Sequence, residues 1–199
     1  MYGPTKDPKF SHIEGFEDHG VHVLFAHDKK RPKVPIGVAI DVASPAQEVE
    51  SGRNMNVDYW HYVREKLFKE FSSETAVLGL CGAGADQSPH ILWRKAAEER
   101  MRRARGLNRL LEIARRINRA VDDAWIVAKN DVRYDVPFAH TILNLDLAMR
   151  PIPEADYRRA KAEIEKASVR KNRGLGFHWN NGIVTRYEMQ QTGKTTHPT

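Results

Sequence analysis

The 199-residue chain has little cysteine and no long hydrophobic run. Its single cysteine, Cys81, cannot form an internal disulfide, so the sequence neither indicates nor excludes an oxidising compartment. No stretch of about 18 apolar residues occurs, so we expect no membrane-spanning segment. The first ten residues, MYGPTKDPKF, lack the apolar core of a secretory signal, so we expect no signal peptide here. The localisation is left unassigned.

Low-complexity tracts and internal repeats are also missing. Hydrophobic residues make up 41% of the chain and charged residues 29%, which excludes a disordered, collagen-like or fibrous protein. The length suits one compact domain with a sizeable core. We expect an irregular arm over residues 1–20, an α/β domain over 21–190 and a polar tail over 191–199.

Segments whose apolar residues predict a strand alternate along the chain with segments whose apolar residues predict a helix. Short apolar runs predict a strand pair at 21–26 and 36–43, and a strand covered on both faces at 75–81. Apolar residues at i, i+4 spacing within 59–71 predict a helix, and Asp58 before them is its expected N-cap. One long helix is predicted from Pro89 to about Lys129, and Gly106 breaks or bends it. One or two edge strands are predicted within 136–149, and a surface helix over 153–168. The expected fold class is α/β, a layered mixed sheet with flanking helices, including one long basic amphipathic helix.

Positive charge is concentrated in that long helix. The formal net charge is +6, and the segment 94–119 alone contains ten basic and three acidic residues. On a helical wheel, four arginines lie within roughly 60° of each other, opposite the apolar stripe: Arg102, Arg105, Arg109 and Arg116. This ridge is either a solvated face or a site for a polyanion. No aromatic residue interleaves with it, so nucleic acid is not an expected partner.

A glycine loop follows the strand predicted at 75–81, where α/β sites normally lie. Gly82, Gly84 and Ala85 let the backbone turn sharply, and free N–H groups in such a loop bind anions or a developing oxyanion. Ser88, followed by proline, is either a helix N-cap or a nucleophile at the mouth of the loop. Asp86 either orients a base or makes an Asx-turn. The loop matches neither the Walker nor the dinucleotide-binding pattern.

Histidines gather near the N-terminus without the spacing of metal ligands. Four of the nine fall within sixteen residues: His12, His19, His22 and His27. Neither HxH nor HExxH occurs in the chain, and residues 19 and 22 of a strand point to opposite faces. The residues alone therefore do not favour a metal site.

Three segments together resemble a known family. GVAIDVASPAQEVE, NMNVDYWHYVREKL and AVLGLCGAGADQSPH are similar in order and pattern to the neutral/alkaline non-lysosomal ceramidases, particularly their bacterial relatives. ARRINRAV and VPFAHTILNLDLAMRPIPEADYRRAKAEIEKA extend the likeness, which spans roughly residues 16–188. GADQSPH resembles the family's Gly-Asp-Val-Ser-Pro-Asn, whose serine lies beside a catalytic zinc and corresponds to Ser88.

The resemblance implies a zinc-dependent amidohydrolase acting on a lipid amide, N-acylsphingosine or a related compound, in a family of sphingolipid metabolism that is often secreted or periplasmic. The chain departs from the family where Ser44 occupies the position of a zinc histidine, since serine is a poor zinc ligand. Ala85 also stands at the position of the first glycine of the family's motif. The family's other zinc ligands lie before and after the matched segment. The chain thus resembles the middle of a longer catalytic domain.

The sequence predicts a ceramidase-like amide hydrolase in which Ser88 and Asp86 are the catalytic candidates, and Gly82, Gly84 and Ala85 form the oxyanion loop. The zinc site is expected to be incomplete in this chain, so it should not hydrolyse amides alone. The open sheet edges of such a portion favour self-association. Two alternatives stand beside this reading: a polyanion-binding module that uses the arginine ridge, and a non-catalytic remnant of the fold.

Overall fold

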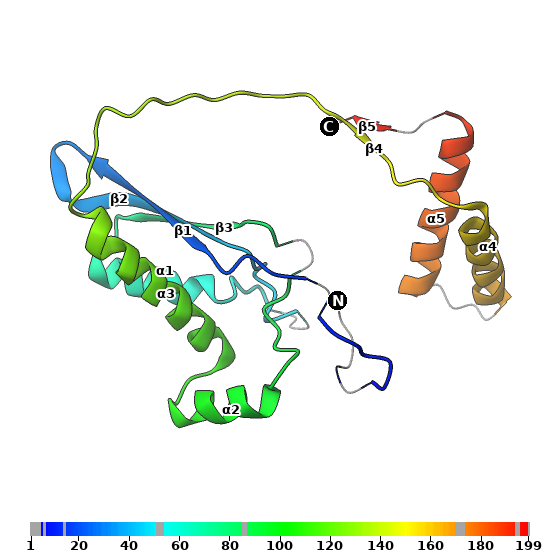
Figure 1. Cartoon of the computed structure of the whole chain (residues 1–199), viewed down its shortest axis with the longest axis horizontal. Coiled ribbons are helices and arrows are strands. Elements are labelled where there is room, and N and C mark those ends of the chain that lie inside the picture. The colour runs from blue at the N-terminus through cyan, green and yellow to red at the C-terminus, as the bar shows by residue number, and fades with distance from the viewer. Residues whose placement is uncertain are drawn as a thin grey trace. The chain divides into compact units, whose positions relative to one another are not determined.

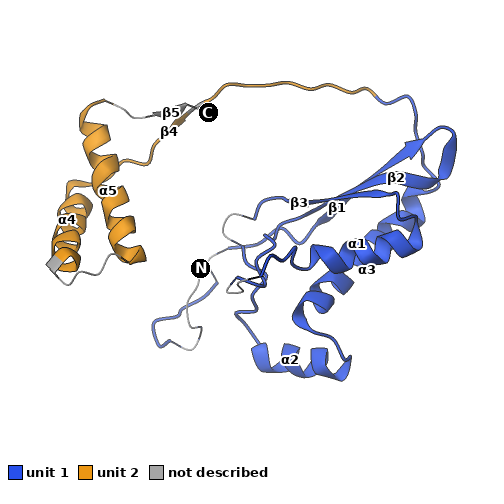
Figure 2. Ribbon diagram, turned by 180° about the vertical axis from the view of Figure 1, so that it is seen from behind, with its two compact units in different colours: residues 1–136 blue, residues 137–199 orange. Residues whose placement is uncertain are grey.

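The structure is a computed structural model that describes residues 5, 7–13, 15–50, 54–84, 87–169, 174–193 and 196–198. It divides into two compact units, Met1–Val136 and Pro137–Thr199 (Figure 2). Both the glycine loop and the arginine ridge belong to the first unit. No helix among the described residues combines the length and apolarity needed to cross a membrane.

The first unit is built on a three-stranded mixed sheet, which confirms the α/β class. Strands β1 (Val21–Asp28) and β2 (Arg31–Val42) form an antiparallel hairpin, and β3 (Ala76–Cys81) pairs with β2 in parallel. Because β2 and β3 run in the same direction, the loops that follow Val42 and Cys81 leave the sheet at one edge. The sheet order β1-β2-β3 places β1 and β3 at the two edges of the described sheet.

Two helices cover one face of the sheet, α1 (Trp60–Glu70) and α3 (Arg109–Ala128) (Figure 1). The core between helices and sheet is built by fully buried side chains such as Ile40, Val63 and Val121. Gly79 lies under the Trp60 ring, where a Cβ atom would come within 2.5 Å of ring carbons. A glycine is therefore required for this close packing of β3 against α1.

The other face of the sheet is uncovered in the described part of the unit. Leu24 of β1 is 69% exposed, and Leu78 and Leu80 of β3 are 57% and 42% exposed. The prediction that residues 75–81 form a strand covered on both faces is therefore wrong, although the strand itself is confirmed. A continuous apolar run indicated burial on both sides, but helices pack on only one.

The long basic helix is two helices. Helix α2 (Lys95–Ala104) and α3 are separated by Gly106, whose φ of 67° lies in the left-handed region, and by Asn108, whose side chain accepts the N–H of Leu111. Asp58, predicted as the cap of α1, instead has a φ of 55° and a buried carboxylate that accepts the N–H groups of Val49 and Tyr59.

The second unit is a helical hairpin with a short strand pair. Helix α4 (Glu154–Val169) confirms the surface helix, whereas α5 (Leu175–Gln191) was not predicted. The Tyr157 and Tyr187 rings stack with centroids 4.2 Å apart, and the Gln190 amide hydrogen-bonds both backbone groups of Ile152. Strands β4 (Asp146–Ala148) and β5 (Thr196–Pro198) pair antiparallel, so only three residues of 136–149 form a strand.

Candidate active site at the carboxyl end of the parallel strands

The loops that follow β2 and β3 meet at the edge of the sheet where both strands end. Tyr59, the residue before α1, donates its hydroxyl proton to the Ser44 carbonyl over 2.8 Å, which holds the first loop. Burial raises the pKa of the Tyr59 hydroxyl to about 12, so it stays a donor. Gly84 lies where a Cβ atom would come 2.6 Å from the Cys81 Sγ and 3.4 Å from the Ser44 nitrogen. A larger residue at position 84 would therefore clash with the Cys81 side chain of the same segment, beside the first loop.

Ser88 does not cap a helix. Residues 87–94 are non-helical, and α2 begins only at Lys95. The Ser88 Oγ instead accepts the N–H of His90 over 3.2 Å, which closes a tight turn through Pro89. The N-cap prediction is therefore wrong, because the serine hydroxyl satisfies a turn N–H two residues on and Arg94 immediately before α2 takes a left-handed conformation.

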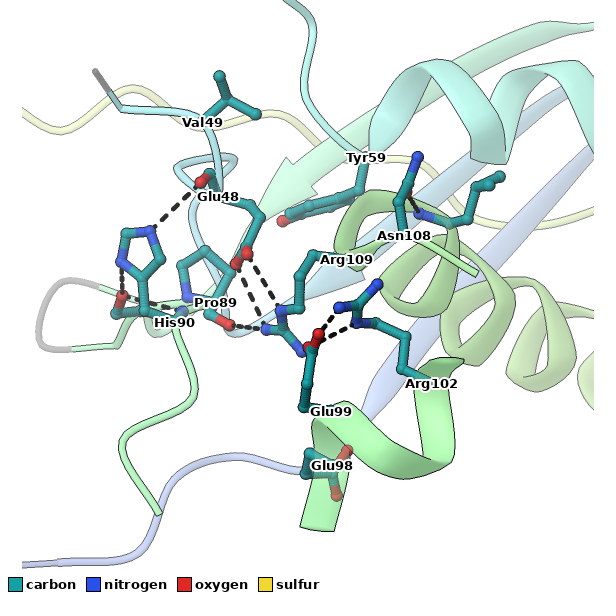
Figure 3. A network of polar contacts seen from close by, with 12 residues as sticks. Glu48, Val49, Tyr59, Pro89, His90, Glu98, Glu99, Arg102, Asn108 and Arg109 are labelled. Carbon is teal, nitrogen blue, oxygen red and sulfur yellow. Dashed lines mark hydrogen bonds and ion pairs between the residues drawn. The ribbon is translucent and has the colours of Figure 1, made fainter. Parts of the chain in front are cut away.

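The hydroxyl of Ser88 also lies next to a histidine ring. The Ser88 Oγ is 3.1 Å from the His90 Nδ1. On the other side of the ring, the His90 Nε2 is 3.3 Å from the Glu48 carbonyl oxygen (Figure 3). A carbonyl oxygen can only accept, so the Nε2 carries the proton in the neutral ring. The Nδ1 then holds a lone pair directed at the Ser88 hydroxyl. Such a pair has the geometry of a nucleophile and its general base.

Arg109, the first residue of α3, holds both loops. Its guanidinium binds the Glu48 carboxylate through two hydrogen bonds of 3.0 and 3.3 Å, and it donates to the Pro89 carbonyl over 2.7 Å (Figure 3). The Arg109 side chain is 24% exposed and that of Glu48 12%. Because Glu48 and Pro89 flank the His90 ring and the Ser88 turn, Arg109 is a positioning residue for the pair.

The other arginines of the predicted ridge do not form one face. Arg102 binds Glu99 and the Leu107 carbonyl, and Arg116 binds Glu98 and Glu112. Arg105 reaches Glu112 at 3.4 Å from the turn between α2 and α3. The break at Gly106 places these side chains on separate elements, so the single basic helix face predicted from the wheel is wrong.

The glycine loop is described in part. Gly82 donates its N–H to the Val42 carbonyl over 3.0 Å, and Gly84 donates to the Gly82 carbonyl over 2.7 Å, so both N–H groups already have acceptors. Ala85 and Asp86, the other two candidates of this loop, lie outside the described residues. Whether this loop offers free N–H groups therefore depends on residues outside the described ranges, and the oxyanion loop stays a prediction.

The described residues do not fit a zinc ion. Zinc in a catalytic site takes three protein ligands, and no group of three histidine, cysteine, aspartate or glutamate side chains gathers anywhere in the described ranges. Ser44 offers its backbone carbonyl to Tyr59. His22 and Asp41 come within 3.6 Å of each other on β1 and β2, but two side chains do not complete such a site. We derive no step through a metal.

His90, Glu48 and the role of Arg109 were missed in the sequence. The signal for His90 was present as a serine and a histidine two residues apart in GADQSPH. Glu48 and Arg109 are 61 residues apart, and no local pattern indicates that they meet. In comparisons with protein-family models, curated proteins and solved structures, nothing matches this chain. Its fold and its site therefore define no more than an α/β unit with a serine–histidine pair at the carboxyl end of parallel strands.

Proposed function

We propose that the first unit carries the acyl-transfer residues of an amide hydrolase, with Ser88 as nucleophile and His90 as general base. The observation that supports this most directly is the 3.1 Å approach of the Ser88 Oγ to the His90 Nδ1, with the opposite ring nitrogen bound to the Glu48 carbonyl. The resemblance to ceramidases suggests the substrate class, an N-acyl lipid amide such as N-acylsphingosine.

The reaction proceeds in two balanced steps. The Ser88 Oγ attacks the acyl carbonyl while its proton passes to the His90 Nδ1, and the imidazolium returns that proton to the leaving nitrogen. The free amine departs and the acyl group stays on Ser88 as an ester. Water then attacks this ester while its proton passes to the His90 Nδ1, and the imidazolium returns that proton to the Ser88 Oγ as the bond between the acyl carbon and Oγ breaks. The carboxylic acid leaves and the serine hydroxyl is restored. The Glu48 carbonyl stabilises the imidazolium through the Nε2 proton in both steps.

An activated ester tests the serine–histidine pair separately from the lipid substrate. p-Nitrophenyl acetate has a good leaving group and needs no metal, so we expect the chain to release p-nitrophenol with an initial burst. Ser88→Ala should abolish the burst, and His90→Gln should slow acylation by roughly a hundredfold or more. Ser72→Ala, a serine outside the site, is the matched control. No burst, or a burst unchanged in Ser88→Ala, would contradict the proposal.

The alternative is a non-catalytic remnant, favoured by the hydrogen bond from the His90 N–H to the Ser88 Oγ, which gives the serine a structural role. That reading predicts that Ser88→Ala weakens folding by about 1 kcal/mol and changes no reaction. Urea unfolding of the same variant, measured beside the burst, separates the two readings.

We also propose that the first unit self-associates through the bare face and open edge formed by β3. The exposed Leu24, Leu78 and Leu80 side chains and the unpaired β3 edge support this. Light scattering should show a mass that rises with concentration, and Leu78→Lys should return the chain to a monomer. A monomer at every concentration would contradict it, and Leu92→Lys, at an exposed leucine outside the sheet, is the control.

A further inference from the structure

The side chain of Asp58 is joined to the serine–histidine site by a single peptide group. Its Oδ2 atom accepts the N–H of Val49 over 2.9 Å. That N–H belongs to the same peptide group as the Glu48 carbonyl, which lies 3.3 Å from the His90 Nε2 (Figure 3). The N–H and C=O bonds of a trans peptide group point in opposite directions. One line of hydrogen bonds therefore runs from the Asp58 carboxylate through this peptide group and the His90 ring to the Ser88 hydroxyl.

The charge of Asp58 is buried and is held by backbone N–H groups. The residue is only 4% exposed, and its Oδ1 atom accepts the N–H of Tyr59 over 2.8 Å. No cation forms an ion pair with this carboxylate among the residues that the structure describes. A buried carboxylate without a cation is costly unless hydrogen bonds stabilise it. An imidazolium on His90 supplies a positive charge one peptide group away.

The backbone at Asp58 takes a conformation that most residues avoid. Its φ of 55° lies in the left-handed region, and its N–H donates to the Asn56 Oδ1 over 2.6 Å. Strained conformations of this kind gather at functional sites, where the surrounding contacts hold them. Here the strained residue places its carboxylate against the Glu48–Val49 peptide group.

We propose that Asp58 is a positioning residue of the serine–histidine site and that it polarises the Glu48–Val49 peptide group toward the His90 ring. The carboxylate accepts the peptide N–H and so makes the peptide oxygen a stronger acceptor, because hydrogen bonds in a chain strengthen one another. The Nε2 proton is then held on the side of the carbonyl, and the Nδ1 lone pair stays on Ser88. In a serine–histidine–aspartate triad the carboxylate meets the ring directly, whereas here a peptide group lies between them. The catalytic part of this assignment rests on the function proposed above.

The tautomer of the neutral His90 ring tests the polarised peptide group without any reaction. Asp58→Asn removes the charge and leaves one acceptor oxygen for two N–H groups, and asparagine tolerates the left-handed backbone. In ¹H–¹⁵N NMR spectra of the full chain, the share of the Nε2-protonated tautomer should fall in Asp58→Asn. Asp58→Gly, which suits this φ even better, should give the same change. Equal tautomer ratios in the wild type and both variants would overturn the proposal.

A matched control is an aspartate whose carboxylate also accepts a backbone N–H, outside the site. Asp28 does so in the β1–β2 turn, where its Oδ1 accepts the N–H of Lys30 over 2.9 Å. Asp28→Asn should change neither the tautomer ratio of His90 nor the burst with p-nitrophenyl acetate. A change as large as that of Asp58→Asn would overturn the specific role of Asp58.

The rate of acylation tests whether the polarised peptide group serves the reaction. We expect Asp58→Asn to slow the burst with p-nitrophenyl acetate roughly tenfold. In a His90→Gln background the same substitution should change the remaining rate by less than about twofold, because Asp58 acts through the histidine. An equal loss with and without His90 would overturn the role given to Asp58, since it would mark a general loosening of the loop. A wild type that gives no burst would contradict the proposed function instead, and the tautomer ratios would still decide whether the peptide group is polarised.

Discussion

Arg109 and Arg103 are the same residue type six positions apart, yet they lie in regions with different demands. Arg109 joins the loop after β2 to the loop after β3 through Glu48 and the Pro89 carbonyl. Arg103 binds Glu99 one turn away on α2, with a side chain that is mostly exposed. Both arginines lie in the same basic segment of the sequence. The comparison therefore indicates that the contacts each side chain makes in the fold, and not its local sequence, determine its role.

Burial explains the difference in energy. The Arg109–Glu48 pair is largely withdrawn from water, so removing one partner leaves a charge that neither solvent nor protein satisfies. The Arg103–Glu99 pair is screened by water, and such pairs contribute little. The three predictions below test this contrast, from the largest expected effect to the smallest.

Arg109→Leu should have the largest effect, because it leaves the Glu48 carboxylate without its counter-charge and frees both loops. We expect a loss of about 3 kcal/mol in the free energy of unfolding, measured in urea. The burst at Ser88 should fall with it. Adding Glu48→Leu should recover part of the stability, since the unpaired charge is then gone, but not the burst. A single variant as stable as Arg103→Ala would contradict the role given to Arg109.

Glu112 gives an intermediate case with a pH signature. Hydrogen bonds from Arg115, and further ones from Arg116, lower the pKa of this buried carboxyl to about 2 from an ordinary value of 4.5. The folded chain then binds fewer protons than the unfolded chain between these values, so stability rises with pH there. The contribution should be fully present above about pH 4.5 and lost as the pH falls toward 2.

Glu112→Gln checks that window. At neutral pH the variant should unfold at lower urea, by about 1 to 3 kcal/mol, because three arginines lose their carboxylate. The gap from the wild type should narrow as the pH falls below 4.5. A gap that stays constant across that range would show that the carboxylate charge is not what stabilises this turn of α3.

Arg103→Ala should have the smallest effect. Its partner Glu99 keeps a second arginine, Arg102, so no charge is left unpaired. We expect a change within about 0.5 kcal/mol in urea unfolding, and an unaltered burst. A loss as large as that of Glu112→Gln would mean that the α2 pairs hold more of the unit together than their exposure indicates.

Local patterns predicted most of the first unit. Short apolar runs located β1, β2 and β3, and the i, i+4 spacing located α1. The break at Gly106 was one of the two outcomes predicted there, and the structure confirms it. The helix start was predicted at Pro89, but α2 begins only at Lys95, because residues 88–90 form a turn. Helix α5 was missed because its glycines and asparagines have low helix propensity, whereas packing against α4 stabilises it.

The site was predicted less fully than the fold. Ser88 was located by its glycine loop, but its role as a cap was inferred from the proline after it, and a turn formed instead. His90 lies two residues after Ser88, so the same segment could have predicted a serine–histidine pair instead of a helix cap. The Arg109–Glu48 contact joins segments that are far apart in the sequence. It depends on the parallel pairing of β2 and β3 and on the position of α3, and no local residue spacing predicts either of these.

Covalent labelling of the intact chain with a fluorophosphonate tests the central claim most directly. An activated serine should take one probe per chain, peptide mass spectrometry should place the adduct on Ser88, and His90→Gln should slow its formation by roughly a hundredfold. Arg103→Ala should label at the wild-type rate. A chain that takes no label, or takes it on another residue at a rate indifferent to His90, would contradict the serine–histidine site.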